Sequence, residues 1–177
     1  MRKFLDIISG QLQTYEAATP KANILQRYVG LVEEGYSMGA ISGLKVDEFV
    51  RGYIEALLWS TNDESDPTGG KPLNQSFTAD DLSHEAMDRI ESDCRSFLHK
   101  VGPYLTVDRY KGAGLTSLEA QAGHDFWLTR AGHGSGFWDG DWEGEEDGRF
   151  DGPLTKAAKE MGNIDPYVGD DKKIHLM

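Results

Sequence analysis

The chain has 177 residues and carries 18 basic and 30 acidic side chains, which gives a net charge of −12 at neutral pH. A chain of this length buries enough surface to fold without a metal or a disulfide, and its only cysteine, Cys94, excludes an intramolecular disulfide scaffold. The acidic charge repels phosphate backbones, so direct binding to nucleic acid is not expected.

The N-terminal residues and the apolar runs indicate where the protein acts. Ser9 and Gly10 interrupt the apolar run that a signal peptide needs after its basic start. No apolar stretch approaches the roughly 18 residues of a membrane-spanning helix. We therefore expect a cytoplasmic protein without a membrane segment, built as a single domain over 1–177.

Three segments in the first sixty residues have the spacing of helices. Residues 3–18 and 21–34 are the first two, and Gly35 ends the second. In the third, 46–59, Phe49, Tyr53 and Leu57 recur every four residues, and a second apolar row lies beside them. Such a wide apolar stripe predicts a largely buried helix. A loop is predicted over 60–76, which is rich in Thr, Asn, Asp, Gly and Pro.

A fourth helix is predicted over 78–100. Thr78 can cap its first turn, and the carboxylate of Asp81 can reach back from three residues later. Phe77 and Leu82 occupy the two positions of a hydrophobic staple. The predicted core face of this helix consists of Met87, Ile90, Cys94, Phe97 and Val101.

The last fifty residues have the signals of strands and turns. Aromatic runs on both sides of a glycine-rich turn predict an antiparallel hairpin of 124–130 with 135–139. A short helix is predicted over 154–161, and a second hairpin joins 164–168 to 173–176 through a turn at 169–171. Helices followed by strands indicate an α+β fold, with N-terminal helices packed on a small C-terminal antiparallel sheet.

Residue types that bind metals or transfer protons gather in the first predicted hairpin. His124, Asp125 and His133 are the candidate catalytic residues, with Asp139 close to them in sequence. Their spacing matches no zinc or catalytic signature, so we assign neither a metal nor a cofactor. The alternative is structural: the histidines fix the hairpin by hydrogen bonds, and the neighbouring glycines supply turn conformations.

The segment 139–151 contains seven acidic residues and one basic residue, and so holds half of the net charge. It partly fits a calcium-binding loop, but Phe150 stands where a bidentate glutamate belongs, which favours a solvated acidic loop. Neighbouring aromatic residues of a strand point to opposite faces, so some should lie outside the core. The predicted partner-binding residues are Asp139, Asp141, Glu143, Glu145, Glu146, Asp147, Trp127, Trp138 and Trp142.

Two stretches resemble a known group of proteins. They are the run GHDFWLTRAGHGSGFWD at 123–139 and the element YVGDD at 167–171. Both resemble small uncharacterised proteins of tailed bacteriophages and prophages, and the resemblance covers about the last third of the chain well. It implies a phage origin but no established activity. The longer acidic segment after Asp139 departs from the pattern of this group, so its role is expected to be specific to this chain.

Three functions are open at this point. The first is a phage accessory protein that docks on a basic surface of a host protein, such as a nucleic-acid-binding or defence protein, and modulates it. The second is a small metal-dependent or hydrolytic enzyme that uses His124, Asp125 and His133. The third is a minor component of the virion. The charge and the resemblance favour the first.

Overall fold

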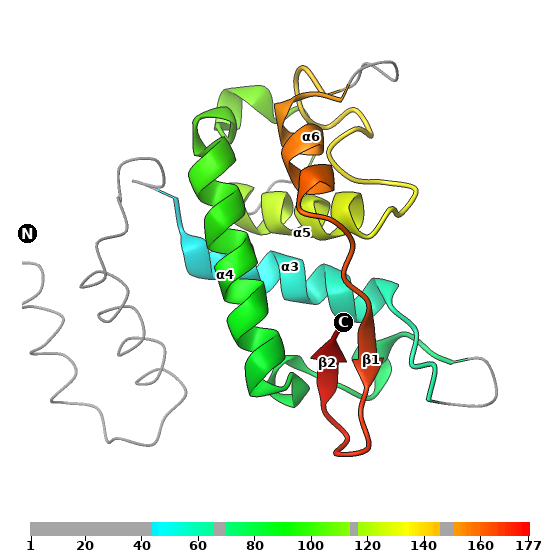
Figure 1. The fold of residues 1–177 in the computed structure, drawn as a ribbon. Helices are drawn as coiled ribbons and strands as arrows, with labels where there is room; N and C mark the ends of the chain where they lie inside the picture. The colour runs from blue at the N-terminus through cyan, green and yellow to red at the C-terminus, as the bar shows by residue number, and fades with distance from the viewer. Residues whose placement is uncertain (1–43, 66–69, 114–116, 146–150) are drawn as a thin grey trace, which may run out of the picture. The chain divides into compact units, whose positions relative to one another are not determined.

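The computed structural model describes residues 44–65, 70–113, 117–145 and 151–177 (Figure 1). The chain divides into two compact units, Met1–Gly39 and Ala40–Met177, and every described residue belongs to the second. The helices predicted at 3–18 and 21–34 lie outside the described residues. Among the described helices, none combines the length and the apolar character needed to cross a membrane.

In the described residues, four α-helices precede a small antiparallel sheet, which confirms the predicted α+β class. The helices are α3 (Val46–Ser60), α4 (His84–Val101), α5 (Leu118–Arg130) and α6 (Pro153–Glu160), and the strands are β1 (Pro166–Val168) and β2 (Ile174–Leu176). Short 3₁₀ turns occupy Leu73–Gln75, Ala79–Asp81, Gly102–Tyr104 and Val107–Arg109. In Figure 1, α4 crosses α3, and α6 leads into the strands.

Helix α3 confirms the helix predicted over 46–59. The side chains of Phe49, Tyr53 and Leu57 are fully buried, and Ile54 and Leu58 of the second row are buried as well. The wide apolar stripe therefore faces the interior on more than one side, as the sequence pattern indicates.

The segment predicted as one helix over 78–100 is divided by a second cap. Thr78 and Asp81 form the expected capping box, in which the Thr78 N–H donates to Asp81 Oδ2 at 2.8 Å, but this box opens only a 3₁₀ turn. Ser83 then caps α4, because its hydroxyl accepts a hydrogen bond from the Ala86 N–H at 3.1 Å. The predicted core face of α4 is confirmed at Ile90, which is fully buried. Cys94, Phe97 and Val101 are buried on the same face.

The hairpin predicted over 124–130 and 135–139 is wrong, because residues 118–130 form helix α5. Every residue from Asp125 to Arg130 is buried, so the second half of the helix has no exposed face. An apolar run buried on all sides has no helical period, and periodicity cannot then distinguish it from a strand. Ser117 caps the N-terminus of α5, because its hydroxyl accepts a hydrogen bond from the Ala120 N–H at 3.2 Å.

The glycine-rich stretch after α5 ends the helix rather than turning a hairpin. The His133 N–H donates to the Leu128 carbonyl, and the Gly132 N–H donates to the Thr129 carbonyl. These two bonds form a Schellman motif, whose C′ position requires the left-handed conformation that Gly132 adopts with φ +71°. The chain then folds back on α5, where the Phe137 N–H donates to the Thr129 hydroxyl at 2.9 Å.

The C-terminal part follows the prediction. Helix α6 matches the helix predicted over 154–161 to within one residue at each end. Strand β1 pairs with β2 in antiparallel register, with Tyr167 opposite His175. The Ser83 N–H donates to the Ile174 carbonyl, which joins β2 to the start of α4. Pro166 lies in β1 and lacks an N–H group, so this strand offers a poor edge for further pairing.

Aromatic rings and one buried ion pair hold the helices together. Phe97 of α4 stacks on Phe126 of α5 with ring centroids 4.0 Å apart. Arg130 is buried, and its guanidinium donates to Asp93 Oδ2 at 2.7 Å and to two carbonyl groups that follow α6. Beside them Cys94 is completely buried, and this burial raises the pKa of its thiol.

Candidate functional site

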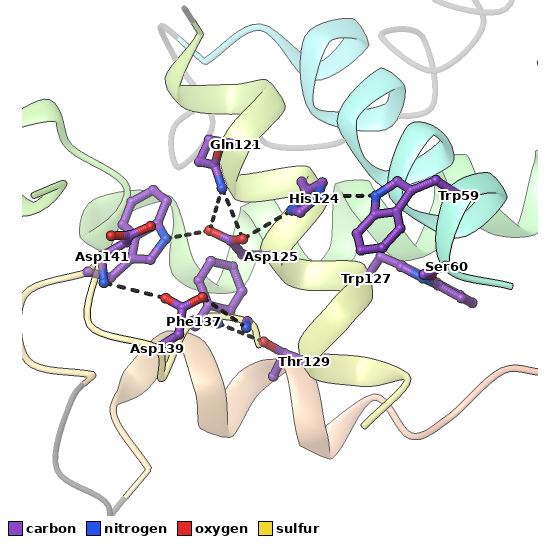
Figure 2. Close-up of polar contacts among 12 residues, drawn as sticks. Trp59, Ser60, Gln121, His124, Asp125, Trp127, Thr129, Phe137, Asp139 and Asp141 are labelled. Atoms are coloured by element: carbon purple, nitrogen blue, oxygen red, sulfur yellow. Dashed lines mark hydrogen bonds and ion pairs between the residues drawn. The ribbon is translucent and has the colours of Figure 1, made fainter. Parts of the chain in front are cut away.

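Helix α5 approaches α3 closely because a glycine faces the backbone at two points. A Cβ atom on Gly52 would lie 1.9 Å from the Ala120 carbonyl oxygen, and one on Gly123 would lie 2.0 Å from the Phe49 carbonyl oxygen. Only glycine fits at such distances. The close approach brings His124 of α5 beside Trp59 at the end of α3 (Figure 2).

Asp125 is the centre of a polar network between α5 and the loop that follows it (Figure 2). Its buried carboxylate accepts hydrogen bonds from Trp142 Nε1 at 2.7 Å and from Gln121 Nε2 at 3.0 Å. His124 Nδ1 lies 3.2 Å from the same carboxylate. These partners satisfy the hydrogen-bonding capacity of the buried carboxylate, and the carboxylate in turn orients their side chains.

His124 connects this network to the surface. Its Nε2 accepts a hydrogen bond from Trp59 Nε1 at 3.3 Å, and the two rings stack with centroids 5.8 Å apart. Because the indole N–H can only donate, the hydrogen bonds assign the neutral tautomer with the proton on Nδ1, directed at Asp125. The pair thus holds the exposed Trp59 ring in one orientation.

The structure does not bring His133 to this pair. His124 and Arg130 are six residues apart on α5, about 9 Å along the helix axis, and His133 follows beyond that end. The described residues contain no group of three or more His, Cys, Asp or Glu side chains placed to hold a metal. Nor do the hydrogen bonds of the described part join His124 to a serine, threonine or cysteine side chain. The predicted three-residue cluster is therefore reduced to His124 and Asp125.

Three of the predicted partner-binding residues have structural roles instead. Trp127 and Trp142 are buried, and their indole N–H groups donate to the Ser60 hydroxyl and to Asp125. Glu145 is buried and caps α6, because its carboxylate accepts from the Leu154 and Thr155 N–H groups, both at 2.9 Å. These side chains are unavailable to a partner in the folded protein. The physical reason is that aromatic and acidic residue types do not by themselves indicate exposure.

The remaining predicted residues lie nearer the surface. Trp138 is half-buried, and the Lys159 ammonium lies 5.4 Å from its ring centroid. Glu146 and Asp147 lie outside the described residues. Asp139, Asp141 and Glu143 are exposed or partly exposed, and we call these three residues the acidic strip.

Backbone pairing fixes the acidic strip at Asp141 and Glu143 against the segment 109–111. The Glu143 N–H donates to the Arg109 carbonyl and the Lys111 N–H donates to the Asp141 carbonyl, both at 2.8 Å. Tyr110 and Trp142 form an isolated antiparallel bridge between these bonds, and their rings meet edge to face. The strip is therefore held in place by a defined piece of structure.

The charges of this region perturb two side chains. Burial, and then the charge of Asp125, raise the pKa of Asp139 above its ordinary value. Burial, followed by the charges of Asp141, Asp125 and Asp139, raises the pKa of Tyr110. In both cases burial is the larger cause, and the neighbouring negative charges act in the same direction.

Comparisons with protein-family models, with curated proteins and with solved structures find no match to this chain. The assignment of a function therefore depends on the residues themselves.

Sequence reasoning missed three exposed residues, Trp59, Tyr104 and Val107. Trp59 follows the helical stripes of 46–59 but belongs to neither of them, and a tryptophan outside the stripes is a signal of exposure. Tyr104 and Val107 lie in the stretch 104–122, which has no periodicity from which their exposure could be predicted.

Proposed function

We propose that this chain is an acidic binding protein that docks on a basic surface of another protein. The acidic strip supports the proposal most, because backbone pairing with 109–111 fixes the chain at two of its three residues, Asp141 and Glu143, near the surface. Fixed charges attract an oppositely charged partner beyond contact range and increase the rate of association. The net charge of −12 adds to the same field.

The resemblance to tailed-bacteriophage proteins supplies the biological setting of the proposal. In that setting the chain is a phage accessory protein of the bacterial cytoplasm that modulates a host protein, such as a nucleic-acid-binding or defence protein. Nucleic acid itself is disfavoured as the direct partner, because the field that attracts basic proteins repels phosphate groups.

The test is affinity capture from host lysate with the tagged chain as bait, at low and at high salt. One variant neutralises the acidic strip by Asp139→Asn, Asp141→Asn and Glu143→Gln. A matched control removes three exposed acids elsewhere by Glu64→Gln, Glu85→Gln and Asp170→Asn. Glu145 stays unchanged in both variants because it caps α6.

We expect the strip variant to recover several-fold less partner than the control variant at low salt, and the difference to shrink at high salt. Equal recovery by the two variants would show that the strip is not the docking surface. The absence of any salt-sensitive partner would overturn the proposed function.

The enzyme hypothesis keeps one supporting observation, the oriented pair of Asp125 and His124. The Nε2 atom of His124 already accepts a hydrogen bond from Trp59. Metal analysis of the purified protein tests this hypothesis cheaply. One equivalent of bound metal that is lost in His124→Ala would favour an enzyme over a binding protein.

A further inference from the structure

Two large apolar side chains are exposed next to each other in the loop after α4. Tyr104 is 40 % exposed, and Val107, three residues later, is 67 % exposed. Isolated exposed apolar residues are common on protein surfaces, whereas neighbouring ones that border fixed charges are typical of interaction sites. Of the other exposed aromatic residues in the described part, Trp59 stacks on His124 and Tyr167 stacks on His175.

Arg109 connects Tyr104 to the acidic strip. Its guanidinium carbon lies 5.4 Å from the centroid of the Tyr104 ring, and its Nη2 donates to the Glu143 carbonyl oxygen at 2.5 Å. The Glu143 N–H donates in return to the Arg109 carbonyl. Asp108, which is exposed, stands between Val107 and Arg109. Tyr104 is thus joined through Arg109 to Glu143 of the strip, and the exposed Val107 lies two residues before Arg109 in the same segment.

We propose that Tyr104 and Val107 are the apolar anchor of the docking surface, and that the acidic strip is its charged rim. This inference rests on the proposed function and specifies the partner: a protein segment that presents apolar side chains together with lysine or arginine. Truncation of buried anchors in an interface costs more affinity than removal of rim charges, which act mainly on association rate.

Charge complementarity selects this kind of partner over others. Carboxylates at Asp108, Asp141 and Glu143 repel an anionic surface, and they pair with lysine or arginine. Val107 and Tyr104 need apolar atoms to cover them, which a purely ionic partner does not supply. An amphipathic basic segment provides both, because apolar and basic side chains can occupy neighbouring positions on one helix face.

The experiment extends the capture assay with an anchor variant, Tyr104→Ser and Val107→Ser. Its matched control is Tyr167→Ser and Met177→Ser, which alters residues of similar exposure, 42 % and 77 %, on the C-terminal hairpin. We expect the anchor variant to bind at least about tenfold more weakly than the control at both salt concentrations, because apolar contacts are not screened. The strip variant should lose binding mainly at low salt.

Thermal unfolding of each variant shows whether its fold is intact. If Tyr104→Ser disturbs Arg109, the single change Val107→Ser still tests the anchor, and it should lose part of the affinity at both salt concentrations. Unchanged capture by the anchor variant and by Val107→Ser would overturn this inference and leave the proposed function standing. Failure of the wild-type chain to capture a salt-sensitive partner would overturn both. Loss of the captured partner on nuclease treatment would show a nucleic-acid ligand and overturn the protein-segment assignment.

Discussion

Substitution of Gly123 by alanine tests the close approach of α5 to α3. The new Cβ would lie 2.0 Å from the Phe49 carbonyl oxygen and 3.0 Å from the Tyr53 nitrogen. Both atoms belong to the α3 backbone, so no side-chain rotation relieves the overlap. The helices must separate by more than 1 Å to reach van der Waals contact, and a gap of this size forfeits much of the packing between them.

The expected effect has the opposite sign to helix propensity. Alanine in place of glycine stabilises an exposed helix by about 1 kcal/mol, whereas overpacking a core costs about 1–3 kcal/mol and sometimes more. Because the overlap here is with backbone, we expect a net loss of about 2 kcal/mol in the free energy of unfolding, or a fall in Tm of roughly 4–8 °C.

Denaturant and thermal unfolding measure this loss, and Gly134→Ala is the matched control. A Cβ at Gly134 meets nothing within 4 Å, and its φ lies outside the left-handed region. Surface changes of this kind alter stability by no more than about 0.5 kcal/mol. If Gly123→Ala proved as stable as wild type or more stable, α3 and α5 would not be this close in solution.

Three further predictions follow from the buried and charged groups. Arg130→Met leaves the Met161 and Gly162 carbonyls without the donors that Arg130 supplies, while Asp93 keeps its ion pair with Arg89. The change should cost about 3 kcal/mol in denaturant unfolding, while a loss below about 1 kcal/mol would contradict the assigned role. The raised pKa of Asp139 means that its ionisation opposes folding, so Asp139→Asn should be slightly more stable than wild type at neutral pH. That gain should vanish as the pH falls through the raised pKa, and a gain that persists in acid would refute it. Removal of the His124 ring takes away the hydrogen-bond acceptor and the stacking partner of Trp59, so His124→Ala should change the intrinsic tryptophan fluorescence, and an unchanged spectrum would contradict the assigned pairing.

The sequence predicts best where a helix keeps an exposed polar row, as α3 does at Asp47, Arg51 and Glu55. Helix α3 and the buried face of α4 have apolar residues at helical spacing, so the bounds of α3 and the C-terminal end of α4 are close to those expected. The C-terminal hairpin is likewise marked by a turn between two short apolar runs. At the start of α4 the cap is Ser83 and not the predicted Thr78, so the helix begins later than expected.

Helix α5 shows why the rest could not be predicted. Its second half is surrounded by protein, and residues such as Thr129 and Arg130 are buried through partners that come from other elements. The same holds for the candidate site, where Trp59 and His124 are 65 residues apart in sequence. Charge counting could not distinguish Glu145, which caps a helix, from Glu143, which stands at the surface.

Because Cys94 is completely buried, its reaction with a thiol reagent can report local unfolding of this chain. A thiol reagent can reach the only cysteine when α4 leaves the core, so the labelling rate under native conditions measures how often that happens. The raised thiol pKa slows any reaction in the closed state further, because the thiolate is the reactive form. For the same reason a cysteine introduced at exposed Glu64 could carry a fluorophore at a single position without removal of the native residue.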